Sequence, residues 1–184
     1  KDCPLDVYRE CRNTIESAIK KIDLNQLTGS FPMPLKDYWD SVSDTKEFTT
    51  PFQATAFAKY VNLDAQILDV GCGYGRTLQQ LYTMGYPNLT GIDFSRGMIE
   101  RGKKQFPHLN LLVKKNETID FPDNQFDAVI LFAVLTCIPS DHEQQTLIAE
   151  IRRVLKPGGI LYINDFLLNS DDRNVSRYQK CEKK

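Results

Sequence analysis

Residues 67–75 constrain the fold of this chain more than any other stretch. Their sequence, ILDVGCGYG, indicates a short apolar strand that runs into three glycines spaced G-x-G-x-G. A helix is predicted directly afterwards, at about residues 75–84. Glycines at such a junction allow a tight turn and let a ligand approach main-chain N–H groups at the start of a helix. The stretch therefore predicts an α/β fold with a ligand site at the carboxyl end of this strand.

The rest of the chain continues this alternation of strands and helices. Strands are predicted at residues 66–70, 89–92, 109–114, 126–132 and 160–165. Further helices are predicted near residues 52–61, 95–105 and 140–155, the last opened by a capping box of Ser140 and Glu143. Alternating strands and helices favour a parallel sheet with helices on both faces. We expect a doubly wound, mostly parallel Rossmann-like α/β sheet.

Two domains are expected along the chain. Residues 1–50 are predicted to form an N-terminal helical extension and lid, and residues 51–184 the Rossmann-like ligand-binding domain. Within the first part, residues 5–22 carry apolar side chains at helical spacing. Residues 25–51 are turn-rich, and their prolines are expected to interrupt any regular element.

Two carboxylates are placed at neighbouring strand ends. Asp69 lies two residues before the first glycine, where it would repel a pyrophosphate but attract an ammonium group. Asp93 ends the next predicted strand, where an acid can accept hydrogen bonds from both hydroxyls of a ribose. Arg76 occupies the position at which the dinucleotide-binding fingerprint G-x-G-x-x-G has its third glycine. The simpler alternatives stay open: a solvated strand end for Asp69 and a helix N-terminal charge for Asp93.

Five motifs in fixed order carry a family resemblance. They are YWD at residues 38–40, ILDVGCGYG at 67–75, GIDFS at 91–95, FPDNQFD at 121–127 and LKPGG at 155–159. Together they resemble the motifs of class I S-adenosylmethionine (SAM)-dependent methyltransferases, especially the broad type 11 group of small-molecule enzymes. The resemblance spans Tyr38 to about Asp165. It implies the class I methyltransferase fold, SAM as cofactor and S-adenosylhomocysteine as its product.

The resemblance also implies a set of cofactor-binding residues. The full set is Asp69, Gly71, Cys72, Gly73, Gly75, Asp93, Phe94, Ser95, Met98, Asn116, Glu117, Phe132 and Ala133. Asp69, Gly71 and Gly73 would contact the methionine end of SAM, and Gly75 would allow close packing. Asp93 would hold the ribose.

The adenine sub-site departs from the family pattern. Phe94 and Met98 would line the adenine, as in the family. The family usually places Asp followed by Ala after its third strand, whereas this chain has Lys115 and Asn116. Asn116 or Glu117 could supply the polar contact to the adenine amine instead.

The segment after the fourth predicted strand separates classes of methyl acceptor. Phe132 and Ala133 would lie beneath the sulfonium and the sugar. Residues 131–138, LFAVLTCI, lack the (N/D/S)PP(Y/F) motif of DNA amino-methyltransferases. A small-molecule acceptor is therefore favoured.

No catalytic base is predicted. Methyl transfer from a sulfonium is an in-line displacement, in which orientation alone can supply about 7–11 kcal/mol. Candidates near the expected mouth of the pocket are Tyr38, Cys137, His142 and Asp165. Packing for Cys137 and a solvated surface position for His142 stay open, and Tyr38 with Trp39 could form either a lid or part of the core.

Composition argues against other partners. The formal net charge is −1, without the basic excess of a nucleic-acid binder. Five cysteines and two histidines form no CxxC pair or ligand cluster, so we expect no metal site, and reduced thiols in a cytoplasmic protein. No apolar run approaches the roughly 20 residues of a membrane span. Composition predicts no particular oligomeric state.

The end of the chain is expected to differ from the family. Class I methyltransferases add an antiparallel hairpin after the fifth strand, whereas 19 polar-rich residues follow Asp165 here. We expect that hairpin to be missing from the chain as given.

Two alternatives to a SAM-dependent methyltransferase stay open. An NAD(P)-dependent oxidoreductase shares the glycine loop and the acid at the second strand, although Asp69 and the lost third glycine argue against it. A non-catalytic SAM-binding partner or sensor protein would have the same fold.

Overall fold

The computed structural model describes residues 35–138 and 140–165 of the 184-residue chain. The helix predicted at residues 5–22 and the question of a C-terminal hairpin lie outside these described residues.

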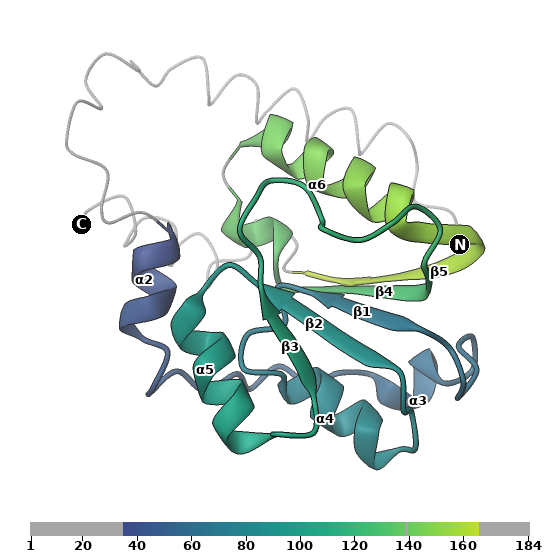
Figure 1. Cartoon of the computed structure of the whole chain (residues 1–184), viewed down its shortest axis with the longest axis horizontal. Helices are drawn as coiled ribbons and strands as arrows, with labels where there is room; N and C mark the ends of the chain where they lie inside the picture. The colour runs from purple at the N-terminus through teal and green to yellow at the C-terminus, as the bar shows by residue number, and fades with distance from the viewer. Residues whose placement is uncertain (1–34, 139, 166–184) are drawn as a thin grey trace, which may run out of the picture. The chain divides into compact units, whose positions relative to one another are not determined.

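A five-stranded parallel sheet forms the centre of the described chain (Figure 1). Its strands are β1 Ile67–Val70, β2 Leu89–Asp93, β3 Asn110–Val113, β4 Phe126–Phe132 and β5 Leu155–Asn164. They lie in the order β3-β2-β1-β4-β5, and all four pairings are parallel. The strand order therefore reverses between β1 and β4, and ligands of doubly wound sheets bind at the carboxyl ends of strands at such a point. The predicted Rossmann-like fold is confirmed.

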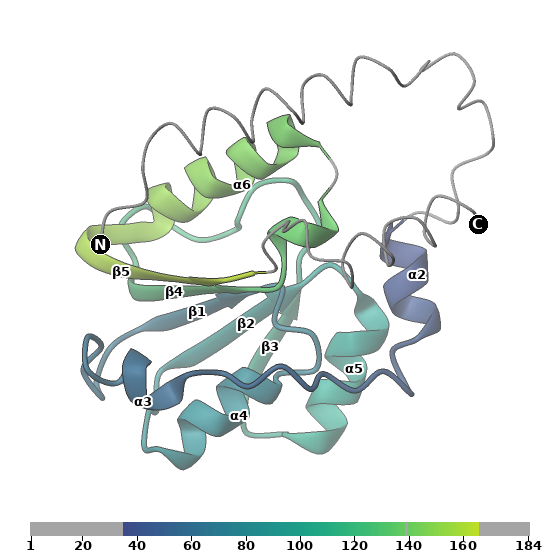
Figure 2. The same ribbon diagram turned by 180° about the vertical axis from the view of Figure 1, so that it is seen from behind.

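Helices cover both faces of the sheet. The helices are α2 Leu35–Ser41, α3 Ala54–Phe57, α4 Arg76–Thr83, α5 Arg96–Gln105 and α6 Asp141–Val154, with a 3-10 turn at Leu135–Cys137. Figure 1 and the reverse view in Figure 2 place α4 and α5 on one face and α6 on the other. Two separate clusters of buried side chains match this division, one with Leu78 and Ile99 and one with Ile151 and Val154.

The central strand β1 is buried along its whole length. Successive side chains of a strand point to opposite faces. Ile67 belongs to the cluster beneath α4 and α5, whereas Leu68 and Val70 belong to the cluster beneath α6. Asp69 shares the face of Ile67, so its carboxylate is directed toward the start of α4.

Three local predictions are corrected. Residues 35–41 form the helix α2 inside a segment predicted to be irregular, because this helix packs against α5. Helix α3 is shorter than the predicted residues 52–61 and continues only as turns. Strand β5 begins at Leu155, before the predicted residue 160, because the Pro-Gly-Gly stretch forms a bulge within the strand and not a turn ahead of it.

The bulge is visible in the pairing of β5 with β4. Phe126 pairs with Leu155, and the next paired residues are Ala128 and Ile160. Residues 156–159 of β5 thus lie opposite the single residue Asp127 of β4. Gly158 within the bulge has φ +78°, a left-handed conformation that favours glycine.

Residues 35–50 belong to the same compact unit as the sheet. The division predicted at residue 50 therefore falls inside this unit, and α2 with the segment after it packs on the Rossmann-like core. Within the described ranges, no helix combines the length and the apolar character needed to cross a membrane.

Candidate functional site

The glycine loop after β1 brings bare main chain to the carboxyl edge of the sheet. Gly71 has φ +74° and Gly73 has φ +55°, both in the left-handed region. A Cβ at Gly71 would lie 2.5 Å from Val134 Cγ2, and a Cβ at Gly73 would lie 2.9 Å from Phe48 Cε2. Side chains at these two positions would therefore collide with the walls of the cavity that the loop borders.

Asp93 fastens this loop to the end of β2. Its Oδ2 accepts a hydrogen bond of 2.8 Å from the Gly73 N–H, and its Oδ1 accepts one of 2.8 Å from the Ser95 N–H. The side chain is 8% exposed. Burial raises the pKa of Asp93, whereas the two N–H donors lower it. Each carboxylate oxygen keeps a further lone pair for a ligand hydroxyl.

Asp69 is more deeply buried, at 2% exposed. Burial raises the pKa of Asp69 to about 7, and the negative charge of Asp93 adds to this effect while Arg76 opposes it. The structure gives the Asp69 carboxylate no hydrogen-bond partner among residues 35–138 and 140–165, although it lines a cavity. Burying a carboxylate without a partner is costly, so the cavity provides a place for a cationic group.

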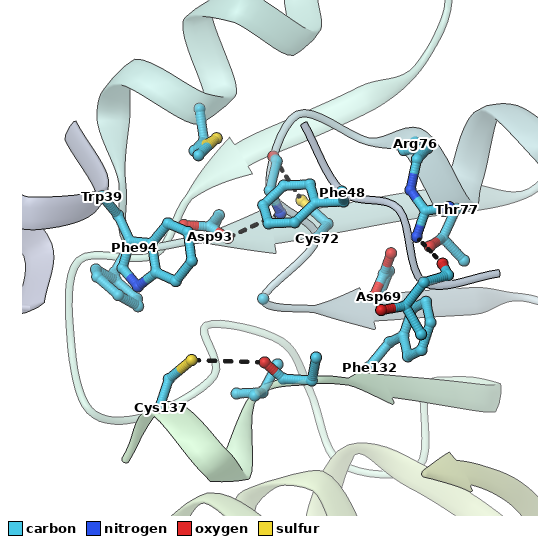
Figure 3. Close-up of a pocket in the computed structure, with 16 residues that line it drawn as sticks. Trp39, Phe48, Asp69, Cys72, Arg76, Thr77, Asp93, Phe94, Phe132 and Cys137 are labelled. Carbon is cyan, nitrogen blue, oxygen red and sulfur yellow. Dashed lines mark hydrogen bonds between the residues drawn. The ribbon is translucent and has the colours of Figure 1, made fainter. Parts of the chain in front are cut away.

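Asp69 and Asp93 line one cavity (Figure 3). In that view Asp69 lies on the side of Phe132, and Asp93 on the side of Trp39 and Phe94. The complete lining is Trp39, Phe48, Thr50, Asp69, Gly71, Cys72, Gly73, Arg76, Thr77, Asp93, Phe94, Met98, Phe132, Ala133, Val134 and Cys137. The cavity thus joins two buried acids, glycine main chain and an aromatic wall.

Comparison with known proteins identifies the family of this chain. A family model described as a methyltransferase domain matches residues 68–163, which include the glycine loop, β2 and β4. The chain belongs to the methyltransferase-domain family. The sequence-based prediction of a class I SAM-dependent methyltransferase is confirmed at the level of family and fold, and SAM is the cofactor of that family.

Individual relatives support the same family. A SAM-dependent methyltransferase from Methanosarcina mazei has 29% sequence identity and a TM-score of 0.64, over 72% of this chain and 66% of that one. An O-methyltransferase from Aspergillus nomiae is 30% identical over 143 residues, 72% of this chain and 62% of that protein. The eEF1A lysine and N-terminal methyltransferase from Mus musculus is 33% identical over 111 residues.

The chain spans only part of these curated relatives. The match to the mouse protein covers 55% of this chain but only 16% of that protein. The match to the Aspergillus protein covers 62% of that protein.

Most of the residues predicted to bind the cofactor lie together in the methyltransferase domain. Those that line the cavity are Asp69, Gly71, Cys72, Gly73, Asp93, Phe94, Met98, Phe132 and Ala133. Ala133 has φ +56°, which is uncommon for a residue other than glycine and bends the chain away from the end of β4.

The remaining predicted residues lie beside the cavity. Gly75 precedes the first residue of α4, and Ser95 caps α5 by accepting a hydrogen bond from the Met98 N–H. Glu117 lines a second cavity, whereas the Asn116 side chain is exposed and donates to Asp120. Of the two candidates for the adenine contact, Glu117 therefore lines one of these two cavities and Asn116 lines neither.

The second cavity adjoins the first and shares five lining residues with it. The shared residues are Gly71, Asp93, Phe94, Val134 and Cys137. Beyond them it extends between the residues after β3 and the start of α6, where Lys114 and His142 lie. The two cavities together follow the carboxyl ends of β1, β2 and β4.

The candidates for acid–base chemistry are spread over this region. Cys137 lines both cavities and His142 lines the second, whereas Tyr38 is 44% exposed and packs edge-on against Trp39. Asp165 accepts a hydrogen bond from the Thr136 N–H. Burial raises the pKa of Cys137, with Asp165 and Asp93 adding to it, so the thiol stays protonated at neutral pH. Cys137 is therefore not an activated nucleophile.

Several lining residues carry no signal in the sequence. Phe48, Thr50, Thr77 and Val134 belong to no motif, and their positions follow from how the chain folds back onto the loop. In the sequence, Arg76 is notable only because it replaces the third glycine of the dinucleotide-binding fingerprint. Its guanidinium donates to the Thr50 carbonyl at 2.7 Å and lies 5.8 Å from the centre of the Phe132 ring.

Proposed function

We propose that this domain binds SAM across the two cavities and transfers its methyl group to a small-molecule acceptor. The observation that carries this proposal is the buried Asp69, which has no hydrogen-bond partner within the described ranges and lies beside the main chain of Gly71 and Gly73. A ligand with an ammonium group would compensate the burial of that charge. The residues present fit such a ligand, because the glycines at positions 71 and 73 leave bare main chain beside Asp69 in the lining of the cavity.

The cofactor would lie along the carboxyl ends of the strands. Its amino group would meet Asp69, and its ribose hydroxyls would donate to the free lone pairs of Asp93. Its adenine would enter the second cavity beside Phe94, where Glu117 is the nearest predicted polar contact. Bound there, SAM would supply an electrophilic methyl group.

The domain's own residues would orient the reactants and exclude water. Trp39, Phe48 and Phe132 supply apolar walls around the first cavity. Such walls hold two reactants in a near-attack geometry and raise the strength of electrostatic contacts by removing water. No side chain is assigned as a base. A dedicated base is required only for an acceptor that must lose a proton.

We propose a small molecule as acceptor for two reasons. Relatives of this domain include a 27-O-demethylrifamycin SV methyltransferase from Amycolatopsis mediterranei, 30% identical over 144 residues, as well as the Aspergillus O-methyltransferase. The lining of the cavity also includes four aromatic side chains, Trp39, Phe48, Phe94 and Phe132, which suits an aromatic or polycyclic acceptor. A protein acceptor, as the name of the mouse relative implies for that protein, is the competing outcome.

Two further expectations accompany this function. We propose that residues 35–50 act as the lid of the predicted N-terminal extension, since they supply Trp39 and Phe48 to the cavity wall. We also propose a cytoplasmic location, which the free thiols of Cys72 and Cys137 support.

Calorimetry followed by a transfer assay tests the proposal. We expect S-adenosylhomocysteine to bind with a micromolar Kd, and NADH not to bind. Radiolabelled SAM should then label members of a panel of phenols, hydroxylated polyketides and amines. Binding without any transfer to small molecules or proteins would favour the non-catalytic alternative. A preference for NADH would overturn the assignment.

A further inference from the structure

The carboxylate of Asp40 lies outside the cavity and connects α2 to the turn between β2 and α5, which directly follows Asp93. Asp40 Oδ1 accepts a hydrogen bond of 2.6 Å from the Ser95 hydroxyl and one of 2.9 Å from the Gly97 N–H. Both donors belong to the first turn of α5, more than fifty residues away in the sequence. Two bonds to one oxygen fix the side chain of Asp40 and, with it, the end of α2.

The same turn holds the second acid of the site. The Ser95 N–H donates to Asp93 Oδ1 at 2.8 Å, and the Ser95 hydroxyl accepts from the Met98 N–H at 3.1 Å. Ser95 is fully buried. Its rotamer is therefore set on one side by Asp40 and on the other by α5, while its backbone holds the carboxylate of Asp93.

Close packing reinforces this connection. A Cβ at Gly97 would lie 2.8 Å from Ser43 Cβ and 3.3 Å from the Asp40 carbonyl oxygen. Ser43 is buried and donates its hydroxyl to the same Asp40 carbonyl at 2.8 Å. Any side chain at position 97 would therefore push the end of α2 away from α5.

A second fastening lies further along the segment. The Arg101 guanidinium donates to the Ser43 and Lys46 carbonyls at 3.0 and 2.7 Å and pairs with Glu47. It also lies 4.0 Å from the centre of the Tyr74 ring, which stacks on Phe48. Trp39 precedes Asp40, which bonds to the start of α5, and Phe48 follows Glu47, which pairs with Arg101 of α5. These two aromatic residues of the cavity wall are therefore held in place from α5.

We propose that Asp40 is a positioning residue for the cofactor site, which joins the aromatic wall and the carboxylate of Asp93 into one preformed unit through Ser95. This inference rests on the proposed binding of SAM. Asp40 would not contact the cofactor, yet its removal would free both Trp39 and the β2–α5 turn. The ligand would then have to order both on binding, which lowers its affinity.

Binding of S-adenosylhomocysteine to variants of the full chain tests this role. We expect Asp40→Ala to raise Kd on the order of tenfold, the effect of losing one part-buried carboxylate acceptor. Asp40→Asn keeps an oxygen in the same place and should stay within about threefold of wild type. Asp37→Ala removes the same charge from the exposed side of the same helix and should leave Kd unchanged.

The only tryptophan of the chain gives a second readout. Trp39 lines the cavity, so its fluorescence reports on the wall directly. In Asp40→Ala we expect a red-shifted, more quenchable emission that ligand partly restores, whereas Asp37→Ala should match wild type. A melting curve distinguishes these effects from unfolding. If Asp40→Ala does not fold, Gly97→Ala takes its place, with the same expected loss of affinity.

The outcomes separate the two proposals. Wild-type binding of S-adenosylhomocysteine with equal affinity in the folded Asp40→Ala variant overturns the positioning role and leaves the proposed function intact. A loss in Asp40→Asn as large as in Asp40→Ala also overturns it, because the oxygen acceptor would then not be the cause. No binding by the wild type overturns both.

Discussion

Asp69, the penultimate residue of β1, and Asp93, the last residue of the adjacent parallel strand β2, line the same cavity, but only Asp93 has hydrogen-bond donors within the described structure. Asp93 accepts the N–H groups of Gly73 and Ser95, whereas Asp69 faces the cavity without such a donor in the described ranges. We therefore propose that the two acids bind different ligand groups. A fixed carboxylate suits hydroxyl recognition, and an unsatisfied buried carboxylate suits a cation.

Replacing Asp93 should remove cofactor binding. Asp93→Ala is expected to weaken S-adenosylhomocysteine binding about hundredfold or more, because two hydrogen bonds to a charged group are lost at about 1.5–3 kcal/mol each. Isothermal calorimetry measures this change. Asp64→Ala, an exposed acid before β1, serves as the control and should bind normally. Unchanged affinity in a folded Asp93→Ala protein would exclude the ribose contact.

Binding should depend on the ionisation of Asp69. The pKa of Asp69 is raised to about 7, chiefly by burial, and an ammonium ligand selects the ionised form. Affinity for S-adenosylhomocysteine should therefore fall as the pH drops below about 7, by up to about tenfold per pH unit. Titrations from pH 5.5 to 8 in wild type and Asp69→Asn check this. The variant should bind weakly with a flatter profile, and an identical profile in both proteins would contradict the role of Asp69.

The same residue should destabilise the ligand-free fold at neutral pH. Its folded-state pKa of about 7 lies above the unfolded value of about 3.9, so the folded protein holds its proton more tightly. The free energy of unfolding then falls as the pH rises from about 4 to about 7, by at most about 4 kcal/mol from this group. Asp69→Asn should gain stability over wild type across that range. Urea unfolding at pH 4.5 and 7.5 measures the difference, and a constant difference would refute it.

Two glycines with left-handed backbones should respond differently to alanine. A Cβ at Gly158 would meet no atom of the described residues within 4 Å, so Gly158→Ala should cost about 1 kcal/mol from backbone strain alone. Gly73→Ala adds a collision with Phe48 and narrows the cavity. We expect Gly73→Ala to lose both stability and cofactor binding, measured by thermal melting and calorimetry. Equal binding by the two variants would show that the glycine loop does not border the ligand.

The sheet and its loop can be predicted because their determinants are local. The apolar run of β1, the glycines after it and the capping serine at position 140 each specify a short element by their own chemistry. The predicted limits of β4 agree with the observed strand, Phe126–Phe132. The order of the motifs along the chain then indicates the parallel pairing.

The walls of the cavity cannot be predicted in the same way. Helix α2 and Phe48 take their positions from contacts with α5 and Tyr74, which are distant in sequence. The bulge of β5 depends on pairing with β4, so the Pro-Gly-Gly stretch by itself suggests a turn ahead of the strand. Such tertiary contacts override local propensity.

The strand order β3-β2-β1-β4-β5 implies that cofactor binding stabilises the folded domain. β4 must pair with β1, although β2 and β3 lie between them in the sequence, before the cavity that both acids line receives its wall at Phe132 and Val134. A partly folded chain would therefore lack the binding site for SAM. SAM at a concentration of a hundred times its Kd would raise the free energy of unfolding of the domain by about 2.7 kcal/mol. The domain would then resist heat and proteolysis better. The lifetime of the protein would thus depend on the concentration of SAM.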